Sequence, residues 1–164
     1  MKTLYLVRHA KSSWKEFDLN DRDRPLNKRG EHDAPLMSKH LKKINVKPSM
    51  IISSPAKRAL TTAKIIASEI DYEKKNITTD ENIYLATSEV LLYLTSKLNS
   101  DLNSVMIVGH NPGITEFLNH LCKTNVDNMP TCSVACIEFQ TDNWSDINNQ
   151  KGKIKFFEYP KKNF

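Results

Sequence analysis

The chain has 164 residues, of which 39% are apolar and 26% are charged. This length suits one domain over residues 1–164, and the composition is typical of a folded globular protein rather than a disordered one. No apolar run approaches the roughly 18 residues that a membrane helix needs. The net charge of +5 favours an anionic substrate or partner, but the lysines are scattered, which argues against nucleic acid.

The chain has three cysteines, an odd number, so they cannot form a complete set of disulfides. Free thiols are typical of a reducing compartment, so we expect a cytoplasmic protein. Cys122, Cys132 and Cys136 could imitate a metal site together with His120. Their spacing is looser than the paired ligands of zinc sites, and we expect small buried side chains and no metal.

The first part of the chain alternates short apolar runs with helical patterns. A buried strand is expected at residues 4–7, and a polar stretch follows over residues 11–27. Apolar residues recur at spacings of three and four over residues 34–44, which predicts a helix that begins near Pro35 or kinks there. A second strand is expected at residues 50–52.

The alternation of strands and helices continues to the end of the chain. Ser54 is the expected N-cap of the second helix, with Pro55 as its first helical residue. A weak strand at residues 77–79 and a third helix over residues 91–98 come next. The remaining elements are a strand at residues 105–108, a helix after Pro112, and strands at residues 133–139 and 154–159. This order predicts an α/β fold, with a mostly parallel sheet between layers of helices.

Three of the predicted strands lead into residues with unusual chemistry. The first ends at Arg8 and His9, the second is followed by Arg58, and the third is followed by His110. Ligands bind at the carboxyl ends of the strands in such sheets, so we expect these four side chains to converge on one pocket.

Histidine can attack phosphorus as a nucleophile, and arginine binds phosphoryl oxygens through two parallel N–H groups. Helix N-termini near Pro55 and Pro112 would add further N–H donors. Each residue alone has an ordinary structural explanation. Their joint occurrence at one edge of the sheet predicts phosphoryl transfer.

Four blocks of sequence resemble those of the histidine phosphatase superfamily, and they occur along the chain in the order of that family. Residues 4–10 (LYLVRHA) resemble its Arg-His-Gly signature, with alanine in place of the glycine. Residues 53–63 resemble the block of the second arginine, and residues 108–112 resemble the block of the second histidine. Residues 24–30 (RPLNKRG) are similar to the Arg-Pro-Leu-Thr segment of SixA-type phosphohistidine phosphatases. The resemblance implies a three-layer α/β/α sandwich, similar to phosphoglycerate mutase, and a phosphatase that needs no metal or other cofactor.

The resemblance also assigns roles to individual residues. His9 would be the nucleophile and would carry the phosphoryl group as a phosphohistidine intermediate. Arg8 and Arg58 would hold the phosphoryl oxygens, and His110 would donate a further hydrogen bond.

Three further residues are candidates for substrate binding. Arg24 is expected as a fourth positive contact. Lys11 and Ser12 follow the nucleophile and could contact phosphate or substrate, although a solvated loop explains these two residues equally well.

Larger members of the superfamily place a glutamate acid/base after the third strand. Here Glu81 falls a few residues before the expected position, which is nearer Ile83 or Tyr84. Glu81 is therefore a candidate acid, with a solvated carboxylate as the alternative interpretation.

The missing acid bears on the substrate. An alkoxide leaving group needs an acid, typically worth about 10²–10⁴-fold in rate, whereas a protonated imidazole leaves more easily. The short chain also lacks the long insertions that enclose small molecules in larger relatives. Both features favour phosphohistidine on a protein, such as a histidine-phosphotransfer domain. The alternatives are a small-molecule phosphomonoesterase or phosphoramidase of the same superfamily and a phospho-binding module without turnover, although such a module would not need the nucleophile.

Overall fold

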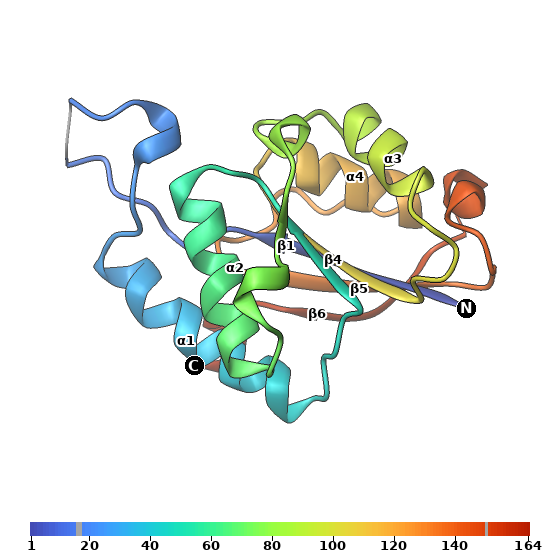
Figure 1. The fold of residues 1–164 in the computed structure, drawn as a ribbon, viewed down its shortest axis with the longest axis horizontal. Helices are drawn as coiled ribbons and strands as arrows, with labels where there is room; N and C mark the ends of the chain where they lie inside the picture. Colours follow the sequence, from blue (N-terminus) through green and yellow to red (C-terminus); the bar gives the residue numbers. More distant parts are fainter. Residues whose placement is uncertain (16–17, 150) are drawn as a thin grey trace.

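In the part of the chain that the structure describes, six β-strands form one central sheet (Figure 1). The structure is a computed structural model that describes residues 1–15, 18–149 and 151–164. The strands are β1 (Lys2–Arg8), β2 (Met50–Ser53), β3 (Thr78–Thr79), β4 (Ser104–Gly109), β5 (Val134–Phe139) and β6 (Lys153–Glu158). Their positions confirm the strands that the sequence predicts, with shifts of a residue or two at the ends.

The sheet is mostly parallel, as predicted. Its spatial order is β3-β2-β4-β1-β5-β6, and the pairs β1–β4, β2–β4 and β2–β3 are parallel. Strand β5 is antiparallel to both of its neighbours, so it alone of the described strands runs in the reverse direction. The carboxyl ends of the others therefore open on the same edge of the sheet.

The register of the strands brings three chain segments together at this edge. Arg8 at the end of β1 lies opposite Gly109 at the end of β4. The His9 N–H donates to the Gly109 carbonyl over 3.2 Å, and the Ser54 N–H donates to the Val108 carbonyl over 3.0 Å. The residues that follow β1, β2 and β4 are thus held side by side by backbone hydrogen bonds.

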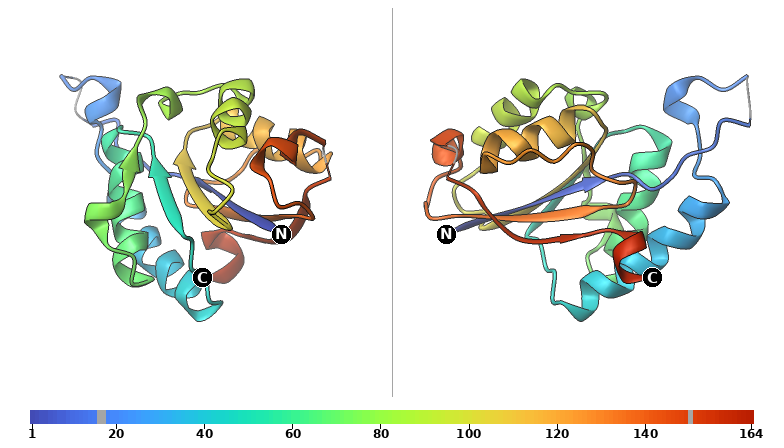
Figure 2. Two further views of the ribbon diagram at one scale, coloured as in Figure 1. Left: turned by 45° about the vertical axis from the view of Figure 1, so that its right-hand side comes forward. Right: turned by 180° about the vertical axis from the view of Figure 1, so that it is seen from behind.

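Helices cover both faces of the sheet (Figures 1 and 2). They are α1 (Lys28–Lys43), α2 (Lys57–Glu69), α3 (Ser88–Ser96), α4 (Gly113–Cys122) and α5 (Pro160–Asn163), with short 3₁₀ helices η1 (Asp21–Asp23), η2 (Lys74–Asn76), η3 (Glu81–Ile83) and η4 (Trp144–Asn149). Helices α1 and α2 pack on one face, and α3 and α4 pack on the other, which confirms the three-layer α/β/α sandwich. No helix among the described residues is both long and apolar enough to cross a membrane.

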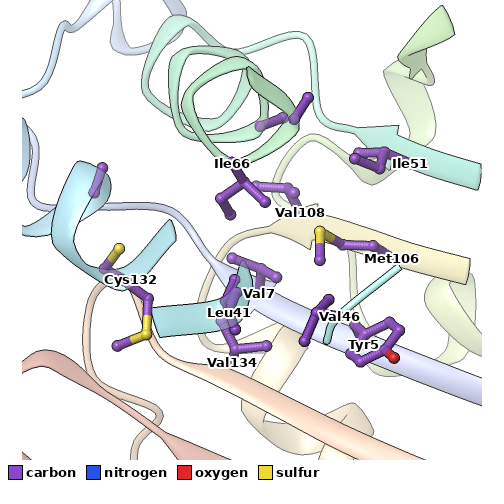
Figure 3. Packing of buried hydrophobic residues seen from close by; sticks show 14 of the residues in the cluster. Tyr5, Val7, Leu41, Val46, Ile51, Ile66, Met106, Val108, Cys132 and Val134 are labelled. Carbon is purple, nitrogen blue, oxygen red and sulfur yellow. The ribbon is translucent and has the colours of Figure 1, made fainter. Parts of the chain in front are cut away.

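The alternation of side chains along β1 divides the core between the two faces. Tyr5 and Val7 point toward α1 and α2, where they pack with Leu41 and Ile66 (Figure 3). The intervening Leu6 points the other way, into the cluster formed with α4. Burial of each large apolar side chain stabilises the fold by roughly 1.5–3 kcal/mol, so both layers anchor the strands that carry the site.

The sheet also separates the cysteines that were considered as metal ligands. Cys132 and Cys136 are buried on the face of α1 and α2, whereas Cys122 packs on the face of α4. All three are free, and burial raises the pKa of Cys132 and of Cys136 to about 12. The three thiols cannot share one metal ion across the sheet. Among the described residues, no group of three or more His, Cys, Asp or Glu side chains could hold one.

The first helix begins earlier than the sequence predicts. Helix α1 starts at Lys28, and the side chain of the N-cap residue Asn27 accepts a hydrogen bond from the Gly30 N–H. Pro35 lies inside the helix rather than at its start. Proline lacks the N–H that would bond the Glu31 carbonyl, but Glu31 is exposed, so water can satisfy its carbonyl.

The second helix begins later than predicted. Helix α2 starts at Lys57, and its N-cap is Ala56 rather than Ser54. The Ser54 hydroxyl oxygen accepts from the Ala56 N–H over 3.2 Å within the preceding turn, and it also contacts His110. The Ser54–Pro55 pair therefore shapes the turn at the edge of the sheet instead of capping the helix.

Candidate active site

A hollow of about 270 Å³ opens at the carboxyl ends of β1 and β4. Its lining includes seven of the eight residues that the sequence singles out: Arg8, His9, Lys11, Ser12, Arg24, Arg58 and His110. The lining also includes Trp14, Asp21, Leu85, Asn111 and Thr131. The structure therefore brings the predicted residues together, and their chemical roles stay predictions.

His9 is buried, and its ring is oriented by a backbone group. The Nδ1 atom lies 2.7 Å from the carbonyl oxygen of Ala10. A carbonyl can only accept, so Nδ1 carries the proton and the other ring nitrogen, Nε2, keeps its lone pair. Burial, reinforced by the positive charges of Arg58 and Arg8, lowers the pKa of His9 to about 4. The ring is thus neutral near pH 7, which is the form that a nucleophile requires.

His110 faces His9 at a ring-centroid distance of 5.2 Å. Its Nε2 atom lies 2.7 Å from the Ser54 hydroxyl oxygen, which already accepts from the Ala56 N–H. A serine hydroxyl can donate to a ring nitrogen or accept from it, and where Ser54 donates to Nε2 the proton of the neutral ring lies on Nδ1. Burial and the charges of nearby His9 and Arg58 lower the pKa of His110 to about 3. Its Nδ1 atom is buried without a hydrogen-bond partner among the described residues, so it can donate to a ligand.

Two arginines reach the hollow from different elements, Arg8 from the end of β1 and Arg58 from the start of α2. Arg8 donates from Nη1 to the Met129 carbonyl over 2.8 Å, and its buried Nε has no partner among the described residues. Arg58, which is buried in the first turn of α2, donates from Nη1 to the Asp21 carbonyl over 2.6 Å and from Nη2 to the Asp21 carboxylate over 2.8 Å. Both guanidinium groups are therefore fixed in place, as bidentate recognition of an anion requires.

Arg24 and Ser12 hydrogen-bond to each other, and Arg24 also bonds to two other residues of the same segment. Arg24 donates from Nη2 to the Ser12 hydroxyl over 2.6 Å, from Nε to the Ser13 carbonyl over 3.0 Å and from Nη1 to the Asp21 carboxylate over 2.9 Å. Its guanidinium also lies 3.2 Å from the centre of the Trp14 ring, in a cation–π contact. Arg24 therefore links the segment between β1 and α1 to the hollow and adds positive charge to its wall.

Asp21, which no sequence motif singled out, lies at the centre of this network. Its carboxylate accepts from Arg24, from Arg58 and, over 2.5 Å, from the Tyr84 hydroxyl. Partial burial opposes ionisation, but these hydrogen bonds hold the pKa of Asp21 well below its ordinary range. The signal in the sequence was a carboxylate three residues before Arg24, in a polar segment expected near a cluster of arginines.

Glu81, the candidate acid, does not line the hollow. It is exposed, and Arg22 donates to its two carboxylate oxygens over 2.7 and 2.9 Å. These bonds lower the pKa of Glu81, which favours the carboxylate over the protonated form that an acid needs. Nearer the position where larger relatives carry their acid, Tyr84 contacts the ring of His110 edge-on at 5.5 Å.

Lys11 is exposed on the rim of the hollow, and its backbone is held close to α1. The Asn27 N–H donates to the Lys11 carbonyl over 3.0 Å. A Cβ atom on Gly30 would lie 2.2 Å from the same carbonyl oxygen, so only glycine allows this approach. The segment that follows His9 is therefore anchored where its side chains border the hollow.

This fold and this site define an α/β protein with a hollow that is lined by two histidines and three arginines. The family model of the histidine phosphatase superfamily (branch 1) matches residues 4–83. An uncharacterised chloroplast protein of Arabidopsis thaliana is 31% identical over 153 residues, which cover 88% of this chain and 70% of the relative.

Solved structures share the fold over nearly the whole chain. The crystal structure of a candidate phosphohistidine phosphatase SixA from Agrobacterium tumefaciens has a TM-score of 0.83 and 25% identity, and the match covers 97% of this chain and 98% of that chain. A structure of the protein histidine phosphatase SixA with tungstate has a TM-score of 0.81 and 19% identity, with 98% of each chain covered. The chain belongs to the histidine phosphatase superfamily, and its structure is similar to SixA.

The lowered pKa values of the two site histidines predict a pH-dependent stability. In the unfolded chain a histidine takes up a proton below about pH 6.5, whereas the folded state binds it only near pH 4 for His9 and pH 3 for His110. Between pH 6.5 and pH 5 the unfolded state thus binds more protons than the folded state. As the pH falls through this window, each histidine should lower the free energy of unfolding by up to about 1.4 kcal/mol per pH unit.

Urea unfolding of the wild type at a series of pH values measures this slope. The double variant His9→Gln, His110→Gln should show a flatter dependence than the wild type. The matched control His32→Gln removes an exposed histidine and should leave most of the slope in place. A wild-type stability that does not change over this window would contradict neutral, buried site histidines.

Proposed function

We propose that this protein removes the phosphoryl group from phosphohistidine on another protein, through a phosphohistidine intermediate on His9. One observation carries the proposal: the neutral ring of His9 shares its hollow with arginines, while the only carboxylate among the described lining residues is held ionised. Such a site suits a nucleophile and an anion but has no protonated acid for a difficult leaving group.

The proposed reaction has two displacements at phosphorus. The Nε2 lone pair of His9 attacks the phosphorus, and the bond from phosphorus to the substrate imidazole breaks as that imidazole takes a proton from solvent. Water then attacks the phosphoryl group on His9, which releases inorganic phosphate and restores the neutral ring. Arg8, Arg58 and the Nδ1–H of His110 would stabilise the phosphoryl oxygens while their charge spreads in each transition state.

The state of Asp21 supports a substrate with an easy leaving group. Its pKa is held far below neutrality by Tyr84, Arg58 and Arg24, so it cannot donate a proton near pH 7. Glu81 is held by Arg22 outside the hollow. An imidazole that is protonated by solvent needs neither residue, whereas an alkoxide does.

The rim of the hollow supports a protein substrate. Trp14 and Leu85 line it, and they are 70% and 55% exposed, which is unusual for large apolar side chains beside a polar site. Leu85 has a left-handed backbone with φ of 50°, and the next residue, Ala86, lies so close to α4 that a Cβ on Gly113 would be 1.8 Å from its carbonyl oxygen. A fixed, apolar rim suits contact with the surface around a phosphorylated side chain.

The proposal includes the domain organisation of the chain and a mechanism without a metal ion. We place residues 1–164 in one histidine phosphatase domain, since the sheet takes strands from both ends of the chain. We also expect metal-independent catalysis, because Arg8, Arg24 and Arg58 can neutralise the phosphoryl oxygens that a metal ion would otherwise contact. The second candidate function is a small-molecule phosphatase of the same superfamily, which the same residues could support.

A panel of phosphate donors, assayed with and without EDTA, tests this proposal. The donors are a phosphohistidine protein, phosphoramidate, an aryl phosphate and sugar phosphates. We expect the highest kcat/KM for the phosphohistidine protein, unchanged activity in EDTA and competitive inhibition by vanadate. Activity that is lost in EDTA and restored by magnesium would contradict the metal-free mechanism. A preference for a sugar phosphate would favour the second candidate.

Replacement of Glu81 by glutamine tests whether the enzyme has a dedicated acid. Since Glu81 is ion-paired outside the hollow, Glu81→Gln should change the hydrolysis of phosphohistidine, aryl phosphate and alkyl phosphate by less than about twofold. The alkyl phosphate should be a poor substrate for both proteins. Glu31→Gln, an exposed change in the first turn of α1, is the matched control. A loss of about 10²-fold confined to the alkyl phosphate would instead identify Glu81 as the acid.

A further inference from the structure

A second hollow adjoins the one around His9. Its volume is about 370 Å³, and three residues, Arg8, Lys11 and Thr131, line both hollows. The rest of its wall comes from the start of α1, the loop before β5 and the C-terminal segment: Arg29, Asn128, Pro130, Tyr159, Pro160 and Lys161. Because the two hollows share three lining residues, they lie side by side.

The charge of this second hollow is strongly one-sided. Its charged lining residues, as far as the structure describes them, are Arg8, Lys11, Arg29 and Lys161, and all four are cationic. Arg29 has an acidic neighbour, Asp33, with 3.5 Å between its Nε and the carboxylate. Over residues 1–15, 18–149 and 151–164, no ion pair is formed by Lys11 or Lys161. Cations gathered without matching carboxylates create a positive potential that attracts an anion.

The fold holds these cations together although they are far apart in the sequence. Helix α5 packs against α1 near the C-terminus (Figure 2), and Arg29 of α1 and Lys161 of α5 line the same hollow. Pro160 is buried at the start of α5, and Asn163 donates to the Glu158 carboxylate over 2.7 Å. Lys11 is held next to α1 through the close approach of its backbone to Gly30.

We propose that this second hollow is an anion subsite for the substrate. It binds a carboxylate or a second phosphate of the same molecule whose phosphoryl group enters the hollow of His9. On a protein substrate, this group is an acidic side chain beside the phosphohistidine. On a small molecule, it is a second phosphate. The subsite thus selects substrates by a second negative charge, through residues such as Arg29 and Lys161 that take no part in the displacement at phosphorus.

The protein source rests on the proposed function, so the test has two arms. In the first arm, phosphohistidine peptides carry either glutamate or glutamine beside the phosphohistidine, and kcat/KM is compared. In the second arm, calorimetry measures the binding of α,ω-alkane bisphosphonates of increasing chain length and of the matching alkyl monophosphonates. The second arm needs no turnover and therefore tests the subsite independently of the phosphohistidine activity.

The variants Lys161→Ala and Lys162→Ala are a matched pair. Both remove one lysine from α5, but Lys162 pairs with Glu158 and does not line the hollow. We expect the wild type to prefer the glutamate peptide, and a bisphosphonate of suitable length to bind roughly tenfold more tightly than its monophosphonate. Lys161→Ala should reduce both preferences by about threefold to fivefold, and Lys162→Ala should leave them unchanged. Activity on the glutamine peptide should be similar in all three proteins.

Each other outcome is decisive in a different way. If neither anion preference exists in the wild type, or if Lys161→Ala and Lys162→Ala behave alike, the subsite proposal is wrong. If no peptide is dephosphorylated but the bisphosphonate preference exists and depends on Lys161, the subsite stands, its source is a small molecule, and the phosphohistidine proposal is wrong. If only the peptide preference depends on Lys161, the subsite recognises a carboxylate on a protein.

Discussion

The parallel register of β1 on β4 is the constraint on which the site depends. Arg8 and Gly109 end the two strands opposite each other, and a histidine directly follows each strand in the sequence. Backbone hydrogen bonds continue past the strand ends, from the His9 N–H to the Gly109 carbonyl and from the Ser54 N–H to the Val108 carbonyl. The two imidazole rings and the turn into α2 are therefore set by the sheet, and the apolar side chains that bury both faces of the sheet also position the chemistry.

Electrostatics shapes the rest of the site. Several guanidinium groups lie close together at the edge of the sheet, and buried charges are costly unless hydrogen bonds and an opposite charge compensate them. Asp21 supplies that charge to Arg24 and Arg58, and it also anchors the segment between β1 and α1 to the hollow. Burial, reinforced by the same positive charges, lowers the pKa of His9 and of His110 and keeps both rings neutral near pH 7. One network thus holds the arginines in place around an unprotonated His9.

Much of this arrangement could be predicted from the sequence. The apolar runs and the order of strands and helices indicated the sandwich, and the residues after three strands indicated one shared pocket, because parallel strands end on the same edge. The helix boundaries could not be predicted as well. Asn27 caps α1 well before Pro35, and Ser54 hydrogen-bonds within the turn near His110 instead of capping α2. These outcomes depend on tertiary contacts that local patterns do not contain.

The contacts of Asp21 could not be predicted from the sequence for the same reason. Its partners Arg58 and Tyr84 lie 37 and 63 residues away along the chain, so no local pattern links them. Glu81 shows the opposite case, since its position along the chain suggested an acid. Its side chain is paired with Arg22 on the surface instead. Sequence position could indicate which residues reach the edge of the sheet, but not which of the carboxylates faces inward.

In the mechanism that we propose, His9 attacks phosphorus through Nε2 while Nδ1 stays bonded to the Ala10 carbonyl. The most direct test is to quench the enzyme rapidly during turnover of a labelled donor, and then to locate the label by mass spectrometry and ³¹P NMR. We expect acid-labile, base-stable phosphate on Nε2 of His9 in the wild type and no label on the His9→Ala variant. A label on Nδ1, a label on another residue, or no phosphohistidine on the wild-type chain would contradict this mechanism.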